Sequence, residues 1–213
     1  MAQIIGAVLA GGKSSRFDGK NKALELLAGK PLIQHVIDRL RPQVSTLIFS
    51  GEPYELVNVD LDDSPFDSPT WIPDLIADQQ GPLVGVLSCL AYIQNTEAEW
   101  LLTSGCDTPL LPRDLSSKLL QCAQENSSQL CVPQDGNRLQ PANALWHRDL
   151  YAVLKAAVEN KNIRSFHQFL DTHPHAVADW PVGSNNFINL NTQVDLENAE
   201  KLLQQESITK ETS

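Results

Sequence analysis

Short runs of apolar residues alternate along the chain with segments in which apolar residues recur at helical spacing. The runs predict strands, and the first is nearly continuous, which is typical of a strand buried on both faces of a sheet. The predicted strands are 4–9, 46–50, 71–73, 100–104, 130–132, 139–146, 176–180 and 187–188. The predicted helices are 32–42, 82–91, 112–125, 149–158, 166–170 and a last one after Thr192, which has Asp195 three residues later as in a capping box.

This order of elements predicts an α/β fold. Strands that alternate with helices form a mainly parallel sheet covered on both faces, so we expect a three-layer α-β-α sandwich with a doubly wound, Rossmann-like sheet. The length of 213 residues suits one domain, expected over residues 1–205, and the polar residues 206–213 are expected to be a disordered tail. In such a sheet the site lies beyond the carboxyl ends of the strands, where residues that follow different strands should converge.

Composition narrows the class of partner. The net charge is −10 and the pI about 4.8, which argues against nucleic acid or an anionic membrane as the main partner. No apolar run is long enough to span a membrane, and the N-terminus lacks the basic region of a secretory signal, so we expect a cytoplasmic protein. The four cysteines form no C-x-x-C motif and are expected to be reduced and mostly buried.

The loop after the first predicted strand has the composition of a phosphate site. It begins with Gly11-Gly12, which leave backbone N–H groups accessible to an anion. Basic residues follow at Lys13, Arg16, Lys20 and Lys22. A Walker A loop is excluded because Ala7 stands where its first glycine is required, and the G-x-G-x-x-G fingerprint is absent. An ordinary glycine-rich turn with solvated charges remains the alternative reading of this loop.

Polar residues also follow the other predicted strands. They are Ser50, Asp74, Asp107, Asn189 and Asn191. Asp107 is the best metal candidate because Mg²⁺ often takes one or two carboxylates and completes its shell with phosphate and water. The alternatives are a capping role for Asp107, a loop carboxylate at Asp74 with Asp78 as its competitor, and turns or caps for the asparagines.

The segment Gly81-Pro82-Leu83-Val84-Gly85 has two readings. As structure, it is a turn and helix start in which Gly85 permits close packing. As a binding element, its glycines leave room for a second substrate near the metal.

Four motifs in order resemble one family. Leu9-Ala10-Gly11-Gly12 with Arg16 and Lys22, then Gly81–Gly85, Cys106–Pro109 and Asn189–Thr192 resemble the molybdenum cofactor guanylyltransferases of the MobA type, which are nucleotidyltransferases with a glycosyltransferase-A-like fold. The resemblance implies transfer of GMP from GTP to the molybdenum-molybdopterin cofactor, with Mg²⁺ as the metal. It implies GTP and molybdenum-molybdopterin as partners, and proteins that deliver molybdopterin or mature molybdoenzymes as further candidates.

The resemblance also implies roles for residues. It makes Arg16, Lys22 and Asp107 catalytic and Asp107 the metal ligand. Its binding residues are Leu9, Ala10, Gly11, Gly12, Lys22, Ser50, Asp74, Gly81, Asp107, Asn189 and Asn191, with the two asparagines near the pterin or its phosphate. Ser50 is a departure, because the enterobacterial enzyme has a nucleotide-contacting asparagine there; Asp18 and Asn21 also depart from the family pattern in the loop.

Two other functions are considered. A cytidylyltransferase or a sugar-phosphate nucleotidyltransferase would share the fold, and Gly11 with the Gly81–Gly85 and Asn189–Thr192 motifs argues against it. A non-catalytic nucleotide-binding regulator would not need Arg16, Lys22 and Asp107 together.

Overall fold

The computed structural model describes residues 2–10, 16–17, 20–51, 69–76, 81–181, 183, 185–190 and 192–211. The strands are β1 (Ile4–Leu9), β2 (Arg16–Phe17), β3 (Lys20–Asn21), β4 (Leu26–Leu27), β5 (Lys30–Pro31), β6 (Thr46–Ser50), β7 (Thr70–Ile72), β8 (Trp100–Gly105), β9 (Leu130–Asp135), β10 (Arg138–Leu139), β11 (Leu145–His147) and β12 (Ala176–Trp180). The α-helices are α1 (Leu32–Leu40), α2 (Pro82–Ile93), α3 (Leu115–Glu125), α4 (Leu150–Asn160), α5 (Phe166–Leu170) and α6 (Gln193–Glu211). Among these residues no helix combines the length and the apolar character needed to cross a membrane.

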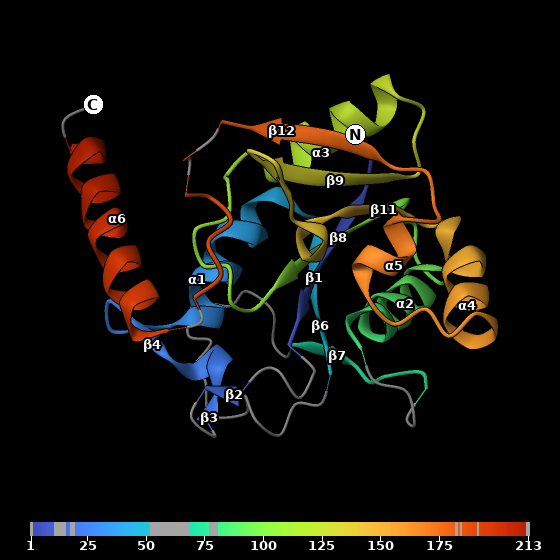
Figure 1. Ribbon diagram of the computed structural model, residues 1–213, viewed down its shortest axis with the longest axis horizontal. Helices are drawn as coiled ribbons and strands as arrows, with labels where there is room; N and C mark the ends of the chain where they lie inside the picture. Colours follow the sequence, from blue (N-terminus) through green and yellow to red (C-terminus); the bar gives the residue numbers. More distant parts are fainter. Residues whose placement is uncertain are drawn as a thin grey trace.

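One mixed sheet of eight strands forms the centre of the molecule, in the order β10-β9-β11-β8-β1-β6-β7, with β12 paired to β9 (Figure 1). The central strand β1 is parallel to both β6 and β8, and β6 is parallel to β7. Beyond β8, the strand β11 runs antiparallel to β8 and β9. The predicted α/β fold with a mostly parallel, doubly wound sheet is therefore confirmed.

The order of strands reverses beside β1. From β1 the chain builds the sheet outward through β6 and β7, and it then returns to place β8 on the other side of β1. Leu9, the last residue of β1, stands opposite Gly105, the last residue of β8. The carboxyl ends of β1 and β8 thus flank the point at which the strand order reverses, where open α/β sheets bind ligands.

Helices cover both faces of the sheet, as predicted. Ile4 and Val8 of β1 belong to the core beneath α1 and α3, whereas Ile5 and Ala7 belong to the core shared with α2, α4 and α5. This alternation follows from the two-residue period of a strand and gives a near-continuous apolar sequence when both faces are buried.

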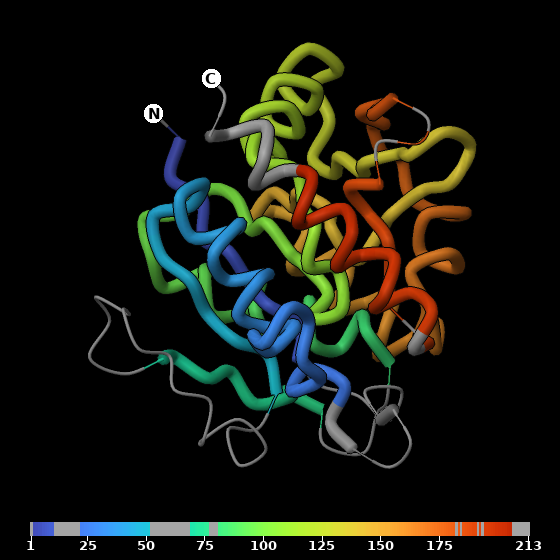
Figure 2. Tube along the Cα trace, turned by 90° about the vertical axis from the view of Figure 1, so that its left-hand side faces the viewer, coloured from blue at the N-terminus to red at the C-terminus, as the bar shows by residue number. Residues whose placement is uncertain are grey.

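The last helix, α6, lies to one side of the sheet, contacts β4 and shares a third core cluster with Leu27 and Leu32 (Figure 1, Figure 2). Thr192 Oγ1 accepts a hydrogen bond from the backbone N–H of Asp195, whose carboxylate accepts one from the backbone N–H of Thr192, so the predicted capping box is confirmed. The expected domain end at residue 205 falls within α6, which continues to Glu211. Good helix formers such as Gln, Glu and Lys are compatible with this continuation.

Two predicted strands are wrong. The hairpin turn after Asp135 is present, but the segment 139–146 is not one strand, because Pro141 opens a 3₁₀ turn that separates β10 from β11. A proline lacks the N–H that a continuous ladder requires. Residues 187–188 are not a strand either: Phe187 lies in a turn with Asn186, and Ile188 has no regular secondary structure.

Candidate active site

A close ion pair lies just beyond the carboxyl end of β8. Lys22 lies in a 3₁₀ turn, Asp107 lies two residues beyond β8, and Lys22 Nζ donates to Asp107 Oδ2 at 2.6 Å. The Lys22 side chain is 7% exposed and the Asp107 side chain 28%. A charge-assisted bond holds such a pair firmly, and a lysine this deeply buried needs a partner for its charge. The pair therefore fixes a carboxylate that still reaches solvent.

The turn that carries Asp107 is tied to the segment before α6. The backbone N–H of Leu190 donates to the Asp107 carbonyl at 3.2 Å, and Thr108 Oγ1 donates to Asn189 Oδ1 at 3.1 Å. A Cβ at Gly105 would lie 2.9 Å from Asp107 Oδ1, so glycine gives the carboxylate its space. The structure thus brings Asn189 to the Asp107 turn across a long stretch of sequence. Asn191 lies outside the described residues.

The end of β1 is held by β6. Leu9 is the register partner of Ser50, and the backbone N–H of Ala10 donates to the Ser50 carbonyl at 3.2 Å. Leu9 and Ala10 therefore stand at the carboxyl end of β1, with the Ala10 N–H already bonded within the protein. Gly11 and Gly12 lie outside the described residues, and Arg16 is described only as part of the β2–β3 hairpin.

Helix α2 packs against the side chain of Ser50. Its side chain is buried, and a Cβ at Gly85 would lie 2.5 Å from Ser50 Oγ. Gly85 thus lets α2 approach the end of β6, which agrees with the packing reading of this motif. At the start of α2, Gly81 has φ +135°, and a Cβ there would lie 2.7 Å from the Arg164 carbonyl oxygen. Both glycines serve the backbone geometry of α2 in this structure.

Asp74 follows the carboxyl end of β7, which lies at the same end of the sheet as the carboxyl ends of β1 and β6, and the residue is exposed. The next residue, Leu75, donates its N–H to Ser88 Oγ of α2 at 2.9 Å. The pKa of Cys89 is raised to about 12, mainly by burial and to a smaller degree by the Asp74 charge. The hydrogen bond between Cys89 and Ser50 acts in the opposite direction and lowers this pKa. Asp74 lies two residues beyond the end of β7, whose last residue pairs with Ser50 at the end of β6. Its competitor Asp78 lies outside the described residues.

The cysteine beside the metal candidate is not a nucleophile. Burial, followed by the neighbouring Asp107 charge, raises the pKa of Cys106 to about 12, so the thiol stays protonated at neutral pH. All four cysteines are free, and three of them are buried, as expected.

The acidic groups present fit one kind of metal site. Within the described ranges no cluster of three or more His, Cys, Asp or Glu side chains could hold a metal by itself. One partly exposed carboxylate at Asp107, beside a space for a ligand, fits a hard divalent cation that takes its other ligands from phosphate and water.

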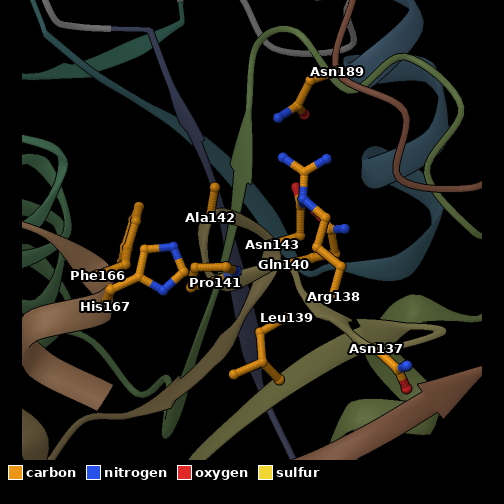
Figure 3. A pocket seen from close by; sticks show the side chains of 10 residues that line it. All are labelled: Asn137, Arg138, Leu139, Gln140, Pro141, Ala142, Asn143, Phe166, His167 and Asn189. Atoms are coloured by element: carbon orange, nitrogen blue, oxygen red, sulfur yellow. The ribbon is translucent and has the colours of Figure 1, made fainter. Parts of the chain in front are cut away.

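A pocket of about 450 Å³ lies beside the Asp107 turn (Figure 3). Its lining residues are Asn137, Arg138, Leu139, Gln140, Pro141, Ala142, Asn143, Phe166, His167 and Asn189. The volume is within the range of about 300–1,000 Å³ that is usual for small-molecule sites. Of these residues, only Asn189 was predicted from the sequence to be a site residue. Pro141 lies inside a predicted strand, and this was the sequence feature that could have indicated a turn and pocket here.

Known proteins resemble the chain over nearly all of its length. The family described as MobA-like NTP transferase domain matches residues 6–176. A molybdenum cofactor guanylyltransferase of Rhodopseudomonas palustris (strain HaA2) is 36% identical over 204 residues, which cover 93% of this chain and 92% of that protein.

Two solved structures share the fold. Molybdopterin-guanine dinucleotide biosynthesis protein A from Archaeoglobus fulgidus superposes with a TM-score of 0.71 at 21% identity, covering 94% of this chain and 99% of its own. The 4-diphosphocytidyl-2C-methyl-D-erythritol synthase from Anaerococcus prevotii superposes with a TM-score of 0.69 at 14% identity, covering 95% and 96%. The fold is therefore common to proteins with different names.

Proposed function

Because the chain belongs to the MobA-like NTP transferase family, it is a nucleotidyltransferase, and we propose that it transfers GMP from GTP to the molybdenum-molybdopterin cofactor. The products are the molybdopterin guanine dinucleotide cofactor and pyrophosphate. The observation that carries this proposal is the Lys22–Asp107 pair at the strand-order reversal, in a chain 36% identical to a guanylyltransferase over 93% of its length.

The transfer is one displacement at phosphorus. An oxygen of the terminal phosphate of molybdopterin forms a bond to the α-phosphorus of GTP. The bond from that phosphorus to the bridging oxygen of the β-phosphate breaks, and pyrophosphate leaves with the electron pair. An ionised phosphate is already a nucleophile, so the step needs no side chain as a general base.

Lys22 and Asp107 serve this step by placing charge. We assign Asp107 as the ligand of Mg²⁺, which when bound withdraws negative charge from phosphate oxygens. Lys22 holds the Asp107 carboxylate in place at 2.6 Å and adds positive charge next to the triphosphate. Arg16 and the amides of Gly11 and Gly12 are assigned to the phosphates from the family motif, and Leu9, Ala10 and Asp74 to the nucleotide.

The pocket beside Asp107 is assigned to the acceptor. Asn189 lines the pocket and also bonds Thr108, the residue after Asp107, so a ligand in the pocket is adjacent to the metal candidate. Asn191 is assigned to the same substrate from the family motif. We further propose that the reaction takes place in the cytoplasm, with proteins that supply molybdopterin and proteins that receive the product as partners.

A cytidylyltransferase would differ from the proposed guanylyltransferase in the base of the nucleotide that it uses. The Anaerococcus prevotii protein, whose name indicates a cytidyl product, has the same fold, so the fold does not select guanine over cytosine. The sequence identity to a guanylyltransferase over nearly the whole chain favours GTP.

The test uses the purified chain with molybdenum-molybdopterin and GTP, CTP, ATP or UTP in turn, with and without Mg²⁺. We expect a dinucleotide cofactor, identified by mass spectrometry, and an equal amount of pyrophosphate from GTP with metal. Product from CTP in preference to GTP would overturn the guanylyltransferase assignment and keep the reaction type. Absence of product from all four nucleotides would overturn both.

A further inference from the structure

The pocket beside Asp107 is lined by side chains that can donate hydrogen bonds. Arg138, Gln140, Asn143 and Asn189 all line it, and no acidic side chain of the described chain does. Guanidinium and amide donors without a competing carboxylate are the usual surroundings of an anion.

Two of the amides are oriented by the protein. Asn143 is 1% exposed, and its Oδ1 accepts from Ser104 Oγ at 3.1 Å and from the Gly105 N–H at 3.4 Å. Asn189 Oδ1 accepts from Thr108 Oγ1. Because both oxygens are occupied by donors of the Asp107 strand and turn, the two amide nitrogens remain to donate to a ligand.

The side chains of Gln140 and Arg138 make no hydrogen bond or ion pair within the described residues. Gln140 is 7% exposed, yet its side-chain amide makes no hydrogen bond with any part of the chain that the structure describes. The Arg138 guanidinium also has no ion pair or hydrogen bond within the described residues, and it points toward Asn189 in Figure 3. Gln140 is nearly buried and its amide lacks a protein partner, whereas Arg138 is exposed and its guanidinium is hydrated in the free protein; an anion in the pocket would supply acceptor atoms to both.

The rest of the pocket gives room for a larger molecule. Phe166 and His167 of α5 lie on the opposite side of Pro141 from Arg138 (Figure 3). An anion bound between Arg138 and Asn189 would thus lie at the Asp107 end of the pocket, with its attached group directed toward α5.

We propose that Arg138 and Gln140, with the amide nitrogens of Asn143 and Asn189, bind the terminal phosphate of the acceptor and orient it for attack on GTP. This inference rests on the proposed function, because it assigns the phosphate of the acceptor to that end of the pocket. It makes Arg138 and Gln140 determinants of acceptor specificity, through recognition of a phosphate monoester.

The first test measures steady-state kinetics of Arg138→Ala, with Arg113→Ala as the matched control, because Arg113 is an exposed arginine that does not line the pocket. Arg138→Ala is expected to raise the acceptor KM about 10- to 100-fold, the loss typical of a hydrogen-bonded charge contact. The GTP dissociation constant is expected to stay unchanged, and Arg138→Lys to recover part of the loss. An unchanged acceptor KM in Arg138→Ala would overturn the proposal.

The second variant, Gln140→Leu, separates ligand binding from structure. Since the Gln140 amide has no partner within the described chain, its replacement by an apolar residue of similar size is expected to leave the unfolding midpoint unchanged or higher while it weakens acceptor binding. A lower midpoint together with an unchanged acceptor KM would assign Gln140 a structural role and overturn its part in the proposal.

A binding experiment keeps this inference distinct from the proposed function. With the nucleotide side saturated by α,β-methylene-GTP and Mg²⁺, methyl phosphate binding is followed by calorimetry in the wild type and in Arg138→Ala. Binding by the wild type that Arg138→Ala loses supports the anion site, even if the wild type forms no dinucleotide. A wild type that forms the dinucleotide but whose methyl phosphate binding is equal in both proteins would overturn the anion site and leave the proposed function standing.

Discussion

Lys22 and Asp107 meet at 2.6 Å beyond the end of β8, whereas Arg138 and Gln140, which line the neighbouring pocket, make no side-chain hydrogen bond or ion pair within the described chain. The first two groups are held in place before any ligand arrives, and the second two are held only by the backbone. An enzyme that uses a charged pair to place a metal needs it rigid, because transition-state stabilisation depends on preorganised charge. A pocket that recognises a separate substrate instead keeps its donors for that substrate.

The largest effect is expected at Asp107. Asp107→Asn keeps the size of the side chain and removes its charge, so the proposed metal ligand is lost and Lys22 loses its anionic partner. We expect the rate of dinucleotide formation to fall by about 10²–10³-fold. Asp114→Asn, an exposed aspartate before α3, is the control and should retain the wild-type rate. Wild-type turnover by Asp107→Asn would remove Asp107 from the catalytic site.

Lys22→Met tests whether the pair acts as a unit. The single change is expected to reduce the rate by about 10²-fold, because one charge contact to the transition state is lost. If Lys22 acts in part by holding Asp107, the double variant Lys22→Met with Asp107→Asn should be less impaired than the product of the two single effects. Rate constants that multiply independently would show that the two residues act separately.

Gly81→Ala tests the backbone at the start of α2. Alanine at φ +135° is strained, and its Cβ would lie 2.7 Å from the Arg164 carbonyl oxygen, which cannot move as a side chain could. We expect the free energy of unfolding to fall by about 2–4 kcal/mol, measured by urea denaturation. An unchanged stability would mean that the start of α2 adopts another backbone conformation.

The smallest of these effects is expected at Gly85. The added Cβ of Gly85→Ala would lie 2.5 Å from Ser50 Oγ, so we expect a loss of about 1–3 kcal/mol in urea denaturation. Ser50→Ala removes that oxygen, and the nearest remaining Ser50 atom would be Cβ at 3.5 Å, so the double variant should regain most of the stability. If the double variant remains as unstable as Gly85→Ala, the contact with Ser50 does not explain why glycine is needed.

The parts of the fold that the sequence predicted well share one property, which is burial on both sides. The apolar runs of β1 and β8 allow few other structures, and the expectation of a site at their carboxyl ends directed attention to Asp107. The distance between Lys22 and Asp107 could not be predicted, because it depends on how a turn 85 positions earlier in the chain folds over the end of β8.

The pocket could not be predicted for a different reason. The segment from 139 to 146 has the apolar character of a strand, and only Pro141 indicates that it turns. Arg138 and Gln140 belong to none of the motifs found in the sequence. Their importance depends on the absence of bonding partners in the described structure, which no local sequence pattern reveals. The segment 187–188 was misread in the same way, since two apolar residues that pack beside a turn look like a short strand.

The most direct test of this division of the site is a calorimetric titration of GTP with Mg²⁺ into Asp107→Asn and Arg138→Ala, beside the wild type. The structure predicts that Asp107→Asn weakens GTP binding and that Arg138→Ala binds GTP as the wild type does. Equal weakening of GTP binding in the two variants would contradict the assignment of nucleotide and acceptor to separate sides of the Asp107 turn.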